Sequence, residues 1–142
     1  MKTHKHIVSI LVLILTALAG FAPISASAHG EDKPGPHGGQ IRMPGAFHTE
    51  LKLRDKRRVT LYLLDMEWKN PVTENSSLTV TFIRAKAKLQ KDLDCKPAGA
   101  AFECSLPDKL SWKSGDELRV LASRAGQTGI PVSYHYPFGH KP

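Results

Sequence analysis

The side chains best suited to chemistry are three histidines and a methionine near the start of the chain. His37, Met43 and His48 lie close together in the sequence, and His29 precedes them. Imidazole and thioether groups are soft-to-borderline ligands that suit copper and zinc. These four residues therefore make the N-terminal region a candidate metal site, for copper first and for zinc or a similar divalent ion second.

The neighbours of these residues predict how they are presented. Residues 47–53 alternate apolar or small side chains with polar ones, which is the period-2 pattern of a half-buried strand. His48 belongs to the polar set, so we expect it to point outward. His37 precedes two glycines, whose backbone freedom lets its ring reach a metal ion or a partner. The alternatives are an ordinary loop histidine and, at Met43, an incidental surface methionine.

His29 becomes the first residue if the chain is cleaved after Ala28. Its amine and its ring Nδ1 could then chelate one copper ion, and a second histidine would complete the nitrogen-rich, square-planar arrangement that Cu(II) prefers. A copper oxidase or oxygenase built on such an N-terminal brace is one alternative. A tail that merely begins with histidine is the simpler one. His135, between two tyrosines, and His140, in the C-terminal tail, are weaker candidates.

The first 28 residues have the pattern of a cleavable secretory signal peptide. Two lysines precede the almost wholly apolar residues 7–24, and residues 26–28 supply the small-residue A-x-A cleavage pattern. We therefore expect export to a bacterial periplasm and no stable membrane insertion after cleavage. An uncleaved single-span anchor is the alternative, since an apolar run of this length approaches membrane thickness.

Beyond this leader, the composition divides the chain into an arm and one domain. We expect residues 29–45, rich in histidine, glycine and proline, to form a flexible arm, and residues 46–142 to form a single domain. Seven or eight short strands separated by turn signals favour an antiparallel β-sandwich of about immunoglobulin size, with a β-barrel as the alternative. The expected strands cover residues 47–53, 58–65, 77–83, 85–93 (where a helix is the alternative), 101–106, 117–123 and 130–136.

The two cysteines predict a cross-link between adjacent strands. Cys95 and Cys104 flank a turn-rich segment between two strand-like runs. In an oxidising compartment, such a pair most simply forms a disulfide. A thiolate metal site or a redox pair is the alternative, but the spacing is not C-x-x-C and no histidine lies nearby in the sequence.

Motifs and charge argue against two other classes of function. The sequence lacks G-x-S-x-G, H-E-x-x-H and a phosphate-binding glycine loop, so we expect no enzymatic activity. The formal net charge is +7, but the basic residues are dispersed and become dense only over residues 52–58. This distribution argues against nucleic-acid binding and fits a solvated surface or a small docking patch.

Two segments, PHGGQIRMPGAFHTELKL and VTLYLLDMEWKNPV, carry a resemblance to a known group of proteins. They resemble exported proteins found with bacterial heavy-metal efflux systems, including the N-terminal regions of periplasmic adaptor subunits of metal-exporting RND pumps. The matching positions are residues 35–39, Gly45, His48, residues 50–51 and residues 61–65. The resemblance implies metal handling near an efflux pump. The long coiled-coil hairpin and the lipoyl-like halves of the adaptors have no counterpart in this chain.

A second likeness concerns architecture only. A histidine directly after the leader and a small β-sandwich are similar to the periplasmic copper-resistance proteins of the C type.

Two hypotheses follow. The first is a soluble periplasmic metal-binding protein that uses His37 and His48, with His29 and Met43, as a buffer or donor in heavy-metal resistance. The second is an interaction module without a metal, which docks on an envelope or efflux partner through strand edges or the basic turn at residues 52–58.

Overall fold

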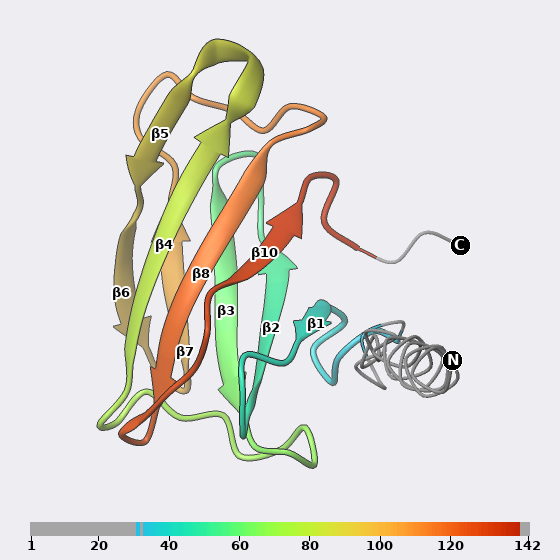
Figure 1. Cartoon of the computed structure of the whole chain (residues 1–142), viewed down its shortest axis with the longest axis vertical. Coiled ribbons are helices and arrows are strands. Elements are labelled where there is room, and N and C mark those ends of the chain that lie inside the picture. The colour runs from blue at the N-terminus through green and yellow to red at the C-terminus, as the bar shows by residue number, and fades with distance from the viewer. Residues whose placement is uncertain (1–30, 32, 140–142) are drawn as a thin grey trace, which may run out of the picture.

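The computed structural model describes residue 31 and residues 33–139, and in this part of the chain it is an all-β protein (Figure 1). The signal peptide, His29 and His140 lie outside the described residues. The ten strands are β1 (Gln40–Arg42), β2 (His48–Leu53), β3 (Arg58–Leu64), β4 (Ser77–Arg84), β5 (Leu89–Asp92), β6 (Asp94–Ala98), β7 (Ala101–Ser105), β8 (Glu117–Arg124), β9 (Gln127–Thr128) and β10 (Val132–His135).

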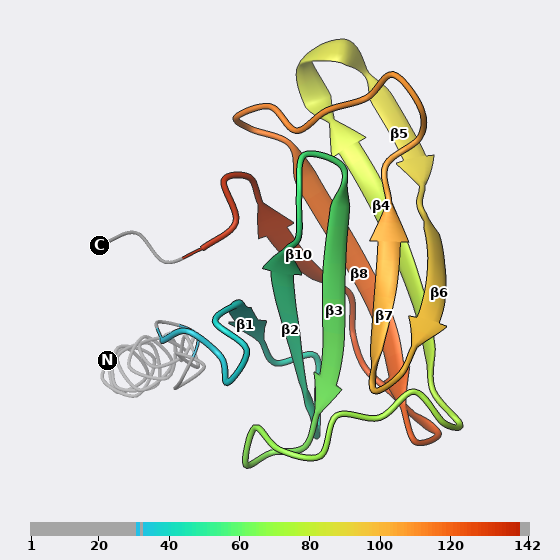
Figure 2. The ribbon, with the colours of Figure 1, turned by 180° about the vertical axis from the view of Figure 1, so that it is seen from behind.

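The strands form two antiparallel sheets that pack face to face, so the predicted β-sandwich is confirmed (Figures 1 and 2). The first sheet has the order β1-β2-β3-β7-β6. The second has the order β10-β8-β4-β5, and β9 pairs with β8. Among the described residues, no helix is long and apolar enough to cross a membrane.

The core lies between the inner faces of the two sheets and follows from the period-2 pattern of the strands. In β2 and β3 the inward positions are apolar or small, and in β4 and β8 the same alternation brings apolar side chains to meet them. The fully buried members of this core include Phe47, Leu51, Val59, Leu61, Leu63, Val80, Phe82, Cys104, Leu118, Val120 and Tyr134.

The expected strand over residues 85–93 begins later than predicted. A 3-10 turn covers Ala85–Ala87, Lys88 adopts a left-handed conformation with φ 50°, and β5 begins at Leu89. The reason is a hairpin, because β5 runs back along β4 with Leu89 opposite Arg84. The alternation of small and basic residues there belongs to the turn as well as to the strand.

The predicted disulfide is confirmed. Cys95 on β6 and Cys104 on β7 are direct cross-strand partners with their Cα atoms 4.1 Å apart, and they are bonded to each other. Cys104 is fully buried in the core. The bond therefore holds edge strand β6 to the rest of its sheet.

The arm expected over residues 29–45 joins the sandwich earlier than predicted. Pro34 forms a bridge with Gln40, and β1 pairs with β2. Ile41 on β1 is fully buried. The sandwich therefore begins well before residue 46. β1 adds an edge strand to the first sheet, and the loop that precedes it packs against that sheet.

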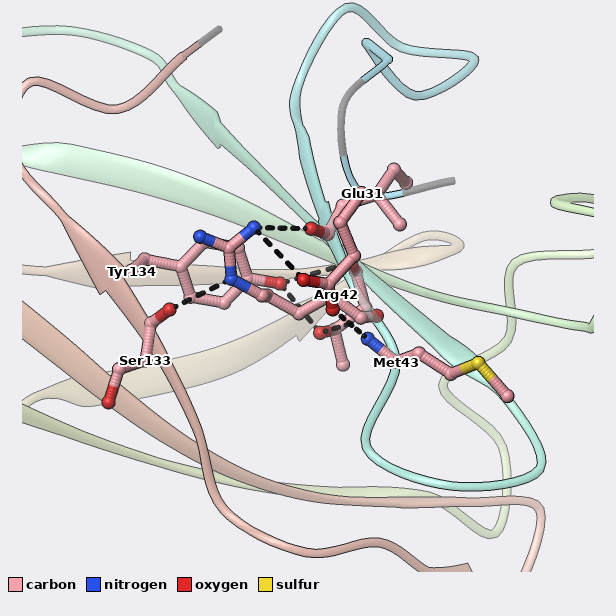
Figure 3. A network of polar contacts seen from close by, with 7 residues as sticks. Glu31, Arg42, Met43, Ser133 and Tyr134 are labelled. Atoms are coloured by element: carbon pink, nitrogen blue, oxygen red, sulfur yellow. Dashed lines mark hydrogen bonds and ion pairs between the residues drawn. The ribbon is translucent and has the colours of Figure 1, made fainter. Parts of the chain in front are cut away.

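Arg42 on β1 and Tyr134 on β10 connect the two sheets where these edge strands meet (Figure 3). The Nε of Arg42 donates to the Ser133 carbonyl at 3.1 Å, and the guanidinium lies 5.5 Å from the centre of the Tyr134 ring. The Tyr134 hydroxyl lies 2.6 Å from Thr49 Oγ1 and donates to the Thr49 carbonyl at 3.0 Å. Burial raises the pKa of Tyr134 well above its usual value, so the hydroxyl stays protonated.

Candidate functional site

A buried carboxylate on the outer face of the first sheet organises the candidate site. Thr49 and Leu51 of β2 face the core, so Glu50 between them faces outward, yet Glu50 is 0% exposed. The loop of residues 34–39 covers it and supplies three donors. Oε1 accepts from the backbone N–H groups of His37 at 2.9 Å and Gly39 at 2.8 Å, and Oε2 lies 2.7 Å from His37 Nδ1.

The His37 ring is fixed by two contacts. Nδ1 is bonded to the Glu50 carboxylate, and the ring stacks on Tyr62 with centroids 3.7 Å apart and planes 3° from parallel. Tyr62 on β3 is the cross-strand partner of Glu50. The His37 side chain remains 32% exposed. Because an Nδ1–H that donates to a carboxylate leaves the lone pair on Nε2, the ring can present Nε2 as a ligand.

The glycines of the G-x-H-G-G pattern make room for this carboxylate. A side chain at Gly35 would collide with the carboxyl group of Glu50. At Gly39, a Cβ would lie 2.6 Å from the carbonyl oxygen of Leu51 and 2.8 Å from Glu50 Cγ. The loop can therefore close over Glu50 only with glycine at both positions, so the spacing of the motif follows from a packing requirement.

His48 occupies the outer face, as its strand pattern predicts, but it is not presented to solvent. It is only 4% exposed, because the loop of residues 65–70 lies over it. Its Nδ1 lies 3.2 Å from the carbonyl oxygen of Asp65, and its ring meets Trp68 edge-on with centroids 5.8 Å apart. The prediction from the sequence concerns only the direction of the side chain, and the covering loop keeps the ring from solvent.

The Asp65 side chain holds the loop that covers His48. Its carboxylate accepts from the backbone N–H groups of Glu67 at 3.0 Å and Lys69 at 2.8 Å, and from the Asn70 amide at 2.7 Å. These hydrogen bonds, that from Lys69 foremost, hold the pKa of Asp65 below its usual value. Within the loop, Trp68 adopts φ 62°, a conformation that bulky residues rarely take.

The predicted ligands are not gathered into one metal centre within the described part of the chain. No group of three or more histidine, cysteine, aspartate or glutamate side chains is placed there to hold a metal ion. His37 belongs to the loop of residues 34–39 and stacks on Tyr62, whereas His48 lies under the loop of residues 65–70. Met43 is 36% exposed, and its N–H donates to Glu31 at 3.2 Å. His135 is exposed at the end of β10, in the second sheet.

Two of the five basic residues in the turn that the second hypothesis uses are paired with carboxylates. Arg57 contacts Asp108, and Arg58 contacts Asp55, each at 2.7 Å. Backbone and side-chain hydrogen bonds from Arg57 and Arg58 hold the pKa of Asp55 below its usual value. The open hollow beside this turn is lined by further aspartates, Asp92 and Asp94 among them. The surface around the basic turn therefore carries charges of both signs.

Sequence reasoning missed three members of the site. Glu50, Tyr62 and Trp68 contact the two histidines directly. A signal for Glu50 does exist, because a carboxylate in mid-strand follows a glycine-rich loop that carries backbone donors. No comparable pattern marks Tyr62 or Trp68, since their roles depend on which loops fold over the sheet.

Comparison of the chain with protein-family models, with characterised proteins and with solved structures finds no match.

Proposed function

We propose that this protein binds a metal ion, copper first and zinc second, through Nε2 of His37. One observation carries the proposal, namely that the His37 Nδ1 is bonded to the fully buried Glu50 carboxylate while the side chain stays partly exposed. Metal-binding histidines characteristically donate their second ring nitrogen to a carboxylate or a carbonyl. This contact fixes the tautomer and makes the ring a better electron donor.

The remaining ligands are proposed to come from the segment that precedes the loop. His29 lies eight positions before His37 in the sequence, within reach of a chain that loops back. Exchange of these ligands would let the ion be passed on, as a metal buffer or a donor to an efflux system requires. Tyr62, stacked on the His37 ring, would keep the imidazole in place while its partners change.

The proposed location is the periplasm. The Cys95–Cys104 disulfide supports an oxidising compartment, because such bonds are rare in a reducing cytosol. The leader pattern of the first 28 residues agrees with this location. A periplasmic component of a metal-efflux system is the partner that this function implies.

Isothermal titration with Cu(II) and Zn(II), on protein purified from the periplasm, tests the proposal. Sub-micromolar one-to-one binding is expected, which corresponds to better than about −8 kcal/mol. His37→Ala should abolish it. Glu50→Gln should weaken it about 10- to 100-fold, the usual effect of removing an outer-shell partner. The matched control is His135→Ala, an exposed histidine in the other sheet, which should leave binding unchanged. Equal binding by wild type and His37→Ala would refute the proposal.

A further inference from the structure

Both methionines in the described part of the chain follow strands that pair with β2 at or beside His48. Met43 follows β1, whose last residue Arg42 pairs with Thr49. Met66 follows β3, whose last residue Leu64 pairs with His48 itself. Because β1 and β3 both run antiparallel to β2, their C-terminal ends adjoin the start of β2, as Figure 1 shows for β3 at the lower end of the sandwich.

The thioethers are available at this end of the sheet. Met43 is 36% exposed and Met66 is 44% exposed, whereas methionine ordinarily fills protein cores. Arg42 faces Tyr134 and the second sheet, and Figure 3 shows the Met43 side chain directed away from that contact. Successive residues of an extended chain point to opposite faces, so Met43 belongs to the outer face, the face of His48.

His48 is prepared in the same way as a metal ligand. Its Nδ1 is held at the Asp65 carbonyl, and a ring that donates there carries its lone pair on Nε2. The ring is 4% exposed, and the indole of Trp68 shields it. Trp68 reaches this position in a left-handed conformation. The Asp65 carboxylate stabilises that conformation because it accepts hydrogen bonds from the backbone N–H groups on either side of Trp68, those of Glu67 and Lys69. Strained residues of this kind cluster at functional sites.

We propose that Met43, His48 and Met66 form a second site, specific for Cu(I), with the indole of Trp68 beside the ion. Thioether ligands are soft and select Cu(I), and the imidazole adds one borderline nitrogen. An aromatic face further stabilises a monovalent cation that is removed from water. The two thioethers and one imidazole of this site differ chemically from the surroundings of His37, where the ring is bonded to a carboxylate. The inference does not depend on the proposed function.

The site implies a direct optical signal. The chain has two tryptophans. Trp68 lies beside His48. Trp112 belongs to the segment between β7 and β8, at the upper end in Figure 1, and packs with Tyr136 and Phe138, which follow β10. Cu(I) bound at His48 should therefore quench the emission of Trp68 and leave that of Trp112 unchanged.

The experiment titrates the full exported chain with Cu(I) supplied from a competing chelator, and follows tryptophan fluorescence. One equivalent should quench the emission, and the change should be absent in Trp68→Phe. Met43→Leu and Met66→Leu, which conserve volume at exposed positions, should each weaken Cu(I) binding at least tenfold. His37→Ala should leave the Cu(I) titration unchanged while it abolishes the Cu(II) or Zn(II) binding proposed above.

X-ray absorption on the Cu(I)-loaded wild type provides a readout that needs no variant, with sulfur and nitrogen scatterers expected around the metal. Three results would overturn the inference: no binding at micromolar Cu(I), a copper shell without sulfur, or a titration that both methionine variants leave unchanged. If only His37→Ala reduces Cu(I) binding, the ion occupies the His37 site and the second site does not exist.

Discussion

At the scale of single residues, the most consequential charge outside the candidate sites is Asp116. Its carboxylate is 1% exposed and accepts from Arg84 Nε, Arg84 Nη2 and the Lys113 backbone N–H, each at 2.7 Å. Burial opposes ionisation, but these hydrogen bonds outweigh it and lower the pKa of Asp116. Removing one member of a buried pair leaves the other charge without compensation.

Asp116→Asn should therefore lower the free energy of unfolding by about 3–5 kcal/mol. Asp108→Asn is the matched control. It breaks the Arg57–Asp108 pair, in which the aspartate side chain is 92% exposed, and should cost no more than about 1 kcal/mol. Urea denaturation of both variants measures the difference, and equal effects would contradict the assigned role of Asp116.

The same aspartate gives a pH dependence with a definite sign. Because its pKa is lower in the folded protein, the folded state gains stability above the unfolded pKa of about 3.9 and loses it as the pH falls from there through the folded pKa. Asp116→Asn should flatten this acid limb of the stability curve, whereas Asp108→Asn should leave it in place.

At the scale of elements, the loop of residues 34–39 leaves no room for added volume at Gly39. In Gly39→Ala the new Cβ would lie 2.6 Å from a backbone oxygen of β2, which cannot move aside as a side chain can. We expect a loss of about 1–3 kcal/mol, the usual cost of overpacking. Urea denaturation measures this loss, and NMR shifts of the His37 ring report whether its stack on Tyr62 persists.

Gly45→Ala is the control for this prediction. Its nearest non-neighbouring atom would be 3.8 Å away, an ordinary contact, and its backbone does not require glycine. The variant should keep both the stability and the ring shifts of the wild type. If Gly39→Ala behaves as Gly45→Ala does, the loop is not closed tightly over Glu50.

The strands show how far sequence patterns reach at this scale. The alternation of apolar and polar side chains correctly predicts the central strands β3, β4 and β8, because the apolar side chains of each strand lie mainly on one face. β1 and β9 are too short to show a period, and β5 is displaced by a turn that the same small and basic residues form. Alternation places His48 and Glu50 on the outer face, but it says nothing of the two loops that bury them.

At the scale of the whole molecule, the candidate metal chemistry depends on loops that cover one sheet, and the sandwich supplies the rigid surface beneath them. The residue types predict the ligand chemistry from the sequence. His37 meets Glu50 only when the loop of residues 34–39 folds over β2, and His48 meets the Asp65 carbonyl only when β3 pairs with β2. Residues remote in sequence therefore determine which ring nitrogen each histidine presents.

The junction of the two sheets gives the last prediction. Tyr134 on β10 bonds to both the hydroxyl and the carbonyl of Thr49 on β2, across the core. Tyr134→Phe removes the hydroxyl and should cost about 1–3 kcal/mol, because it leaves a buried Thr49 hydroxyl without this partner. In Thr49→Val, the Tyr134 hydroxyl keeps the carbonyl as acceptor, so the loss should be smaller.

Adding Thr49→Val to Tyr134→Phe should cost less than the sum of the two single changes, because it removes the group that the first change leaves unsatisfied. Denaturant unfolding of the four proteins measures this coupling. Strict additivity would show that the two hydroxyls do not interact. The sheets would then be held at this edge by apolar packing and by Arg42, whose bond to the Ser133 carbonyl the double variant leaves intact.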